Sequence, residues 1–289
     1  MTQTDFLQQL RKEDSKSFFD GTISGSRETL FCPESLVVSG DIASGTKLIV
    51  EGDVNVQGSV LEASLTATGN IVVDGSFAGA GKGKITSAAD VTVKVVHGQA
   101  IIAQGTITIL TEAINADLCA YNSIEASSAR IVGGKTEASN EINVRVVGSD
   151  DGRSTKVYLG NRKKLLQRLN DIGVEKKVLN ERLPKINKCI YQWNRFRIEG
   201  LVITNEQEIM LEKLRVMRDS FPRQMDLFRK ETDHLKMLLR EKNDSTLSVF
   251  DTLFENVLID INGLREVTDA QHHAVKYFMG SHKLMSMVK

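Results

Sequence analysis

Six short runs of alternating apolar and polar residues recur at a nearly constant spacing between Gly52 and Ser149. Each run follows a polar or glycine corner, and the spacings between their first apolar residues are 17, 20, 16, 17 and 18. Those first apolar residues are Val54, Ile71, Val91, Ile107, Ile124 and Ile142. A repeat of this length indicates a solenoid, and alternation with a period of two indicates strands with one buried face. The sequence therefore predicts a parallel β-helix that acts as a scaffold.

The repeat also predicts which side chains stack inside the β-helix. A strand rises about 3.3 Å per residue, so each rung has room for two or three short strands and their corners. We expect the six residues named above to form one interior row. A second row, two residues further along each run, would contain Val56, Val73, Val93, Ile109 and Val144. Ala126 occupies this second row, and its small side chain predicts a local narrowing.

The corners between the runs contain residues that favour turns. Acidic residues such as Asp53, Asp74 and Asp90 occur one per rung, and we interpret them as turn formers. The glycine-rich stretch 79–84 lengthens one rung, and we predict that it is a bulged corner. A phosphate-binding loop is disfavoured because this stretch lacks the Gly-Lys-Ser/Thr ending and a following helix.

The sequence pattern changes after residue 160, where strand alternation gives way to a heptad repeat. Two rows four residues apart define the first helix: Leu165, Ile172, Leu179, Ile186 and Trp193, followed by Leu169, Lys176, Leu183, Ile190 and Arg197. A second helix has Leu214, Phe221, Phe228 and Leu235 at the same interval. Thr204 with Gln207, or Asn205 with Glu208, offers a capping box at its start. We therefore predict an antiparallel hairpin, with kinks at Gly173, Pro184 and Pro222.

These patterns divide the chain into four parts. Residues 1–30 are predicted to be a leader that caps the solenoid, residues 31–160 the β-helix, and residues 161–243 the coiled-coil hairpin. Residues 244–289 return to strand-like patterns. Because an antiparallel hairpin ends close to where it begins, we expect this last part to pair with the β-helix or to cover its end, since exposed strand edges associate readily.

Composition argues for a protein of a reducing compartment. Cys32, Cys119 and Cys189 are far apart in the sequence and lack CxxC spacing, which disfavours both a disulfide framework and a zinc site. The first residues lack the apolar core of a signal peptide, and no apolar run is long enough to span a membrane. We therefore expect a cytoplasmic protein.

No residue pattern predicts a catalytic site, a metal site or a cofactor. His97 is isolated within the repeat, and we interpret it as a surface residue because no partner for a general base can be named from the sequence. His272 and His273 lack a third ligand nearby, so a surface pair is favoured over a metal site.

Charge is distributed unevenly although the net charge of the chain is zero. Residues 161–199 contain 11 basic and 4 acidic side chains. The simplest interpretation is a solvated face, because the flanks of heptads are normally charged. The next is a binding surface for an acidic protein partner, and nucleic acid comes last because no reading module is present. As candidate partner-binding residues we select Arg195, Arg197 and Lys213.

The order of these parts resembles the bacterial flagellar assembly protein A family. The most specific segment contains Ile131-Val132-Gly133-Gly134-Lys135, Ala138, Ile142, Val147-Gly148-Ser149, Gly152, Thr155 and Leu159-Gly160, and Glu255 to Ile261 follows in the tail. The resemblance covers residues 36–289. It implies a single-stranded parallel right-handed β-helix with an inserted antiparallel coiled-coil hairpin. Typical members have a further N-terminal domain, whereas residues 1–30 alone precede the solenoid pattern here.

The resemblance implies a non-enzymatic protein that serves flagellar assembly or polar placement by binding protein partners and associating with itself. Two alternatives stay open. One is a filament-forming, bactofilin-like cytoskeletal element. The other is a β-helix enzyme, either an acyltransferase or a carbohydrate-active enzyme, which would require clustered polar residues on one face.

Overall fold

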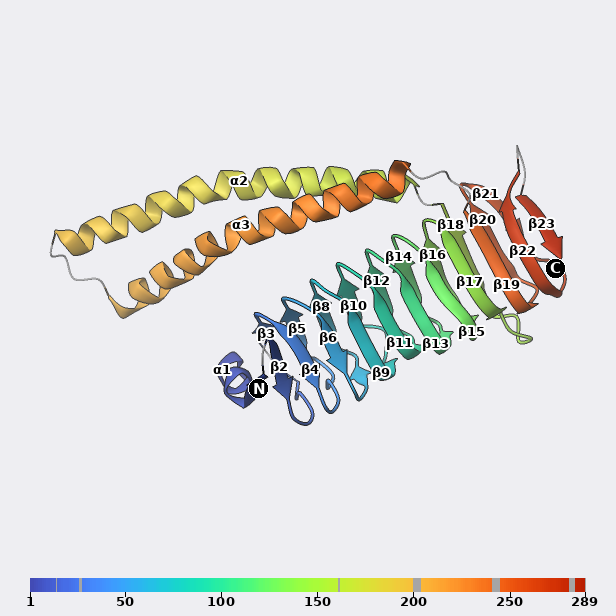
Figure 1. The fold of residues 1–289 in the computed structure, drawn as a ribbon, viewed down its shortest axis with the longest axis horizontal. Helices are drawn as coiled ribbons and strands as arrows, with labels where there is room; N and C mark the ends of the chain where they lie inside the picture. Colours follow the sequence, from blue (N-terminus) through green and yellow to red (C-terminus); the bar gives the residue numbers. More distant parts are fainter. Residues whose placement is uncertain are drawn as a thin grey trace. The chain divides into compact units, whose positions relative to one another are not determined.

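The computed structural model comprises all 289 residues and describes residues 1–13, 15–25, 28–160, 162–199, 204–240, 245–280 and 284–288. The chain forms two compact units. The first contains Met1–Arg162 together with Lys242–Lys289, and the second contains Lys163–Glu241. The first unit is a β-solenoid and the second is a helical hairpin (Figure 1).

Two long sheets form the walls of the solenoid. Along its length, the first sheet contains β1 (Leu10–Glu13), β2 (Lys16–Phe19), β4 (Ser35–Val38), β6 (Val54–Val56), β9 (Ile71–Ala78), β11 (Val91–His97), β13 (Ile107–Ile114), β15 (Ile124–Val132), β17 (Glu141–Val147), β19 (Thr246–Leu253), β22 (His272–Met279) and β23 (Leu284–Val288), with β7 (Val60–Leu61) pairing beside β9. The second contains β21 (Leu264–Val267), β20 (Val257–Ile261), β18 (Thr155–Leu159), β16 (Gly134–Ala138), β14 (Asp117–Ala120), β12 (Ala100–Ala103), β10 (Lys84–Ser87), β8 (Ser64–Ala67), β5 (Lys47–Val50) and β3 (Thr29–Cys32).

The predicted interior row is confirmed residue by residue. Parallel pairing places Val54 beside Ile71, Ile71 beside Val91, and so on through Ile107 and Ile124 to Ile142. All six side chains are at most 1% exposed. Ala126, in the second row, pairs in register with Val144 and is fully buried. The parallel β-helix class is therefore confirmed.

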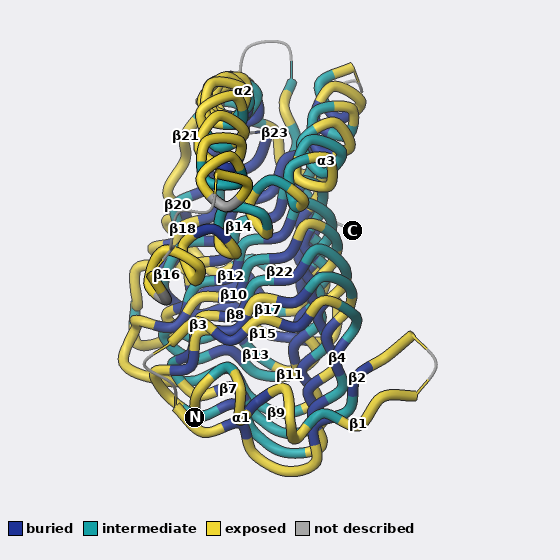
Figure 2. Tube along the Cα trace, turned by 90° about the vertical axis from the view of Figure 1, so that its left-hand side faces the viewer, coloured by how far each residue is buried: buried dark blue, intermediate teal, exposed yellow. Residues whose placement is uncertain are grey.

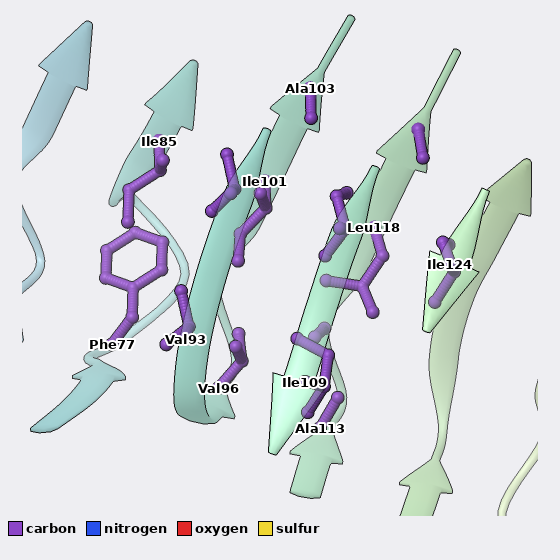
Figure 3. Close-up of a cluster of buried hydrophobic side chains, with 14 of the residues drawn as sticks. Phe77, Ile85, Val93, Val96, Ile101, Ala103, Ile109, Ala113, Leu118 and Ile124 are labelled. Carbon is purple, nitrogen blue, oxygen red and sulfur yellow. The ribbon is translucent and has the colours of Figure 1, made fainter. Parts of the chain in front are cut away.

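Bends within the longest strands let one strand line two sides of the core. The pairing register shifts within β9, β11, β13 and β15, between the first and second halves of each strand. Side chains from both halves point inward and meet those of the second sheet, as Figure 3 shows for Phe77, Ile85, Val93, Val96 and Ile101. Burial of each such side chain contributes roughly 1.5–3 kcal/mol. Figure 2 shows the resulting buried stripes repeating from rung to rung.

Polar corner residues connect successive rungs by side-chain hydrogen bonds. The backbone amide of Asp53 donates to Ser35 Oγ (3.0 Å), and that of Asn70 donates to Asp53 Oδ1 (2.7 Å). In the following rungs, the backbone amide of Asp90 donates to Asn70 Oδ1 (3.2 Å), and that of Thr106 donates to Asp90 Oδ1 (2.7 Å). The row continues through the Asn122 and Asn140 side-chain amides, which donate to Thr106 Oγ1 (3.3 Å) and Asn122 Oδ1 (2.9 Å). Asp53 and Asp90 thus serve as structural hydrogen-bond acceptors, as expected for turn formers.

The N-terminal end of the solenoid is covered by the first residues of the chain. Helix α1 (Gln3–Gln9) begins at a capping box made by Thr2 and Asp5. Its Phe6 is fully buried and stacks on Phe19, with ring centroids 5.8 Å apart. Strand β2 already pairs in parallel with β4. The rungs therefore begin before residue 31, where we predicted the start of the solenoid, and the covering segment is shorter than predicted.

The hairpin consists of α2 (Arg162–Ile198) and α3 (Asn205–Arg240). The capping box at the start of α3 is the one predicted for Thr204: its amide donates to Gln207 Oε1 (2.9 Å), and the Gln207 amide donates to Thr204 Oγ1 (3.3 Å). Both helices continue through their internal prolines, Pro184 and Pro222. Pro184 and Pro222, where we predicted kinks, therefore do not end either helix.

The chain rejoins the solenoid after the hairpin without a break in register. Ile142 in β17 pairs with Leu247 in β19, and Val144 pairs with Val249, all in parallel. The hairpin is thus an insertion at the corner between β18 and β19. After β19, strand β20 still pairs in parallel with β18. The chain then turns back, so that β21 pairs antiparallel with β20, and β22 and β23 add antiparallel strands to the first sheet.

The corner geometry leads to a test by thermal unfolding. A methyl group on Gly105 would collide with Asp90 Oδ1, which accepts the Thr106 amide. We expect Gly105→Ala to destabilise the protein by about 1–3 kcal/mol through overpacking, measured as a lower midpoint in circular dichroism. Gly173→Ala is the matched control, because a Cβ there meets nothing within 4 Å and alanine favours a helix by about 1 kcal/mol. Equal effects of the two changes would contradict this account.

Candidate functional site

Polar contacts fix the register of the helical hairpin. In the predicted seam, Lys176 Nζ of α2 donates to Thr232 Oγ1 of α3 at 3.0 Å. Beside it, Arg168 makes two hydrogen bonds to the buried Glu231, of 2.7 and 3.0 Å. Toward the other end of α2, Arg215 donates to Asn194 Oδ1 at 3.2 Å. Polar side chains in a coiled-coil seam select one alignment, because any other would leave them buried without partners.

The Arg168 side chain is a permanent charge of this seam. The hydrogen bond to Glu231 raises the pKa of the Arg168 guanidinium above its ordinary value, and Glu175 contributes in the same direction. Apolar seam residues surround these contacts, with Leu165, Ile172, Leu211 and Leu235 each at most 3% exposed. These polar and apolar seam groups therefore find their partners within the hairpin. Its outer surface is left available for other contacts.

The three predicted partner-binding residues have different environments. Arg195 is exposed on α2 and forms an ion pair with Glu199 at 2.6 Å. Lys213 is exposed on α3, and no ion pair with it is found among the described residues. Arg197 lies in α2, but its side chain is outside the described residues. A hydrogen bond from Arg215 on α3 to Asn194 on α2 joins the two helices near these residues. Arg195 directly follows Asn194 in the sequence, and Lys213 precedes Arg215 by two residues.

Four apolar side chains next to Lys213 escaped the sequence-based prediction. Ile209, Met210, Val216 and Met217 are 53%, 51%, 61% and 57% exposed. They occur four and three residues before Lys213 and three and four residues after it, so they surround it on the helix surface. We call these five residues the Lys213 patch. The sequence does contain a signal for this patch, because its four apolar residues form a second apolar stripe on α3 beside the heptad seam.

The two helices differ in charge. Helix α2 contains 11 basic and 3 acidic residues, whereas α3 contains 8 and 7. Several acidic residues of α3 are held by neighbouring arginines, including Glu212 by Arg215 (3.4 Å) and Asp219 by Arg218 (2.8 Å). The excess of positive charge on the hairpin thus lies mainly on α2.

On the solenoid, His97 belongs to a row of polar contacts rather than standing alone. Its Nε2 lies 2.8 Å from Glu112 Oε1, and Arg130 Nη2 lies 2.7 Å from Glu112 Oε2. The three residues come from β11, β13 and β15, which are adjacent strands of one sheet. The hydrogen bonds from Arg130 and then His97 lower the pKa of the Glu112 carboxyl below its ordinary value. This arrangement links three rungs and keeps Glu112 ionised, which suits a structural role better than proton transfer.

The described residues contain no group of three or more His, Cys, Asp or Glu side chains that could hold a metal ion. His273 lies 3.4 Å from Thr252 Oγ1 and 3.2 Å from Gln271 Nε2, so its ring has polar neighbours on the sheet surface. The surface pair predicted for His272 and His273 accordingly lies on β22. In the part of the chain that the structure describes, no helix is long and apolar enough to cross a membrane.

The Glu112 cluster gives a testable dependence of stability on pH. Because the pKa of Glu112 is lowered on folding, its contribution is complete above the ordinary value of 4.5 and is lost as the pH falls through the lower folded value. We expect Glu112→Gln to reduce the free energy of unfolding by about 1 kcal/mol at neutral pH. In urea titrations the difference from the unaltered chain should shrink below pH 4.5. A difference that is equal at every pH would contradict the role given to Glu112.

Comparison with protein families gives a match over most of the chain. The sequence model of the flagellar assembly protein A β-solenoid domain matches residues 31–284, which is well over half of the chain. Comparison with curated proteins and with solved structures gives no match.

Proposed function

Since the chain belongs to the flagellar assembly protein A family, we propose that it is a non-enzymatic scaffold in flagellar assembly or polar placement. The solenoid acts as a rigid platform, and the hairpin binds protein partners. The observation that carries this proposal is the hairpin itself, whose seam is complete while exposed apolar side chains line its outer surface. Exposed apolar side chains grouped in this way are typical of interaction sites.

The polar residues of the solenoid support a scaffold over a β-helix enzyme. Asp53 and Asp90 accept backbone amides of the next rung, and His97 and Arg130 pair with Glu112. An acyltransferase or a carbohydrate-active enzyme needs polar groups that converge on a substrate. The groups named here are instead engaged in holding rungs together.

The basic helix α2 favours an acidic protein among the possible partners, because complementary charge speeds and orients encounter.

The cytoplasm is the proposed compartment. Cys32, Cys119 and Cys189 are not joined in disulfides, and cysteines outside disulfides are typical of a reducing environment.

Removal of the hairpin tests the proposal. We expect a chain in which residues 161–243 are replaced by a short corner to keep the strand-rich circular dichroism spectrum, because β17 and β19 pair directly. In affinity capture from a flagellated bacterium, this chain should lose the flagellar proteins that the full chain retains. Full retention of the same proteins by the shortened chain would overturn the assignment of partner binding to the hairpin.

Self-association is the second part of the proposed function, and the ends of the solenoid suggest its geometry. Gln3 covers the β3 edge: its side chain accepts the Phe31 amide (2.7 Å) and donates to the Phe31 carbonyl (2.9 Å). Edge strands β1 and β21 carry exposed charged residues. Strand β23 has an uncharged sequence in which Met285 and Met287 are exposed. Charge and cover both discourage edge pairing, so β23 is the edge best suited to pair with a second copy.

Because β23 is the edge left without charge or cover, a closed two-fold dimer through β23 is favoured over a bactofilin-like filament. We expect light scattering after size exclusion to detect a dimer that Met287→Lys converts to a monomer. Leu7→Lys is the matched control, since Leu7 is also exposed but lies in α1. Filaments in electron micrographs, or a dimer insensitive to Met287→Lys, would rule out this geometry.

A further inference from the structure

We infer that the Lys213 patch binds an amphipathic helix of a partner protein, one that presents a carboxylate surrounded by aliphatic side chains. The inference deepens the partner-binding role proposed above and rests on it. The juxtaposition that carries it is a single exposed cation enclosed by four exposed apolar side chains on one helix face.

The position of Lys213 within the patch dictates a charged group in the partner. Residues three and four apart are neighbours on a helix surface, so any chain that covers the four apolar side chains also covers the Lys213 ammonium. Burial of a cation without a partner is unfavourable by several kcal/mol. Two acidic residues close to it in the sequence offer it little, because Glu212 is paired with Arg215 and Asp219 with Arg218. The partner must therefore supply the carboxylate.

The shape of the patch favours a helix as the bound element. From Ile209 to Met217 the patch extends about 12 Å along α3 at 1.5 Å per residue. Its apolar residues match the spacing by which amphipathic helices pack onto other helices. Met210 and Met217 have unbranched, polarizable side chains, which adapt to the surface of a partner.

The charges around the patch favour a protein over an anionic membrane or a nucleic acid. The first turn of α3 contains Glu206 and Glu208, and Glu212 lies beside Lys213. A continuous anionic surface would bring negative charge against these three residues as well as against Lys213. A helix with one carboxylate at its centre avoids that repulsion.

A designed peptide tests the inference directly. The probe is a labelled synthetic helix with leucines at three and four residues on either side of one glutamate, and its binding to the full chain is measured by fluorescence anisotropy. We expect saturable binding that weakens about tenfold in Lys213→Glu and in the double variant Val216→Ser, Met217→Ser. The control Lys236→Glu makes the same charge change on an exposed lysine of α3 outside the patch and should stay within about twofold.

A charge exchange separates a specific contact from a structural effect. The same peptide with lysine in place of its glutamate should bind Lys213→Glu better than it binds the unaltered chain. Equal weakening by Lys213→Glu and Lys236→Glu, or no saturable binding of the acidic peptide, would overturn the inference. So would binding of phosphatidylglycerol vesicles or duplex DNA that depends on Lys213 when the peptide is not bound.

Affinity capture distinguishes failure of this inference from failure of the proposed function. If Lys213→Glu retains the partners that the chain without its hairpin loses, the hairpin binds them elsewhere and the inference alone is wrong. If both altered chains retain them, both proposals are wrong. Loss of the same partners by both altered chains, with retention by Lys236→Glu, is the expected result.

Discussion

Parallel stacking of successive rungs in register is the constraint on which this structure depends. Each interior residue pairs with its counterpart one rung away, so Ile71 has Val54 on one side and Val91 on the other. A polar or oversized residue in such a row would disturb two neighbours at once. The same stacking pairs the backbone of each rung with the next, so edges are left only at the two ends. This is why the ends and the insertion, rather than the walls, are where association is expected.

Stacking in register also explains how the solenoid tolerates a long insertion. Corners connect strands without belonging to the interior rows, and the hairpin enters at one such corner. Because Ile142 still pairs with Leu247, more than a hundred residues later in the chain, the interior rows continue as though the insertion were absent. The hairpin in turn holds itself together through Arg168, Glu231 and its apolar seam. Each unit can therefore change its surface without changing the fold of the other.

The polar residues that first suggest chemistry in this chain are engaged in structure. Asp53 and Asp90 accept amides from neighbouring rungs, and Glu112 holds His97 and Arg130. What is left for function is mostly apolar and cationic: the Lys213 patch on α3, the basic side chains of α2 and the uncharged edge strand β23. Surfaces of this kind bind other proteins, in keeping with membership of a family of flagellar assembly proteins.

Local periodicity in the sequence determined the fold class, the interior row from Val54 to Ile142, the heptad seam and the capping box at Thr204, because each depends on residues a fixed number of positions apart. Tertiary structure alone decided which separate side chains meet. It brought Glu112 to His97, Gln3 to the Phe31 edge and Lys176 to Thr232. The rung at Lys16–Phe19 lies within residues 1–30, which the sequence pattern separated from the β-helix, because one short strand carries too little periodicity to place that boundary. Lys213 could be selected as a candidate from its charge. The patch around it could be recognised only in the structure, which shows that four neighbouring apolar side chains are exposed and not buried in the hairpin seam.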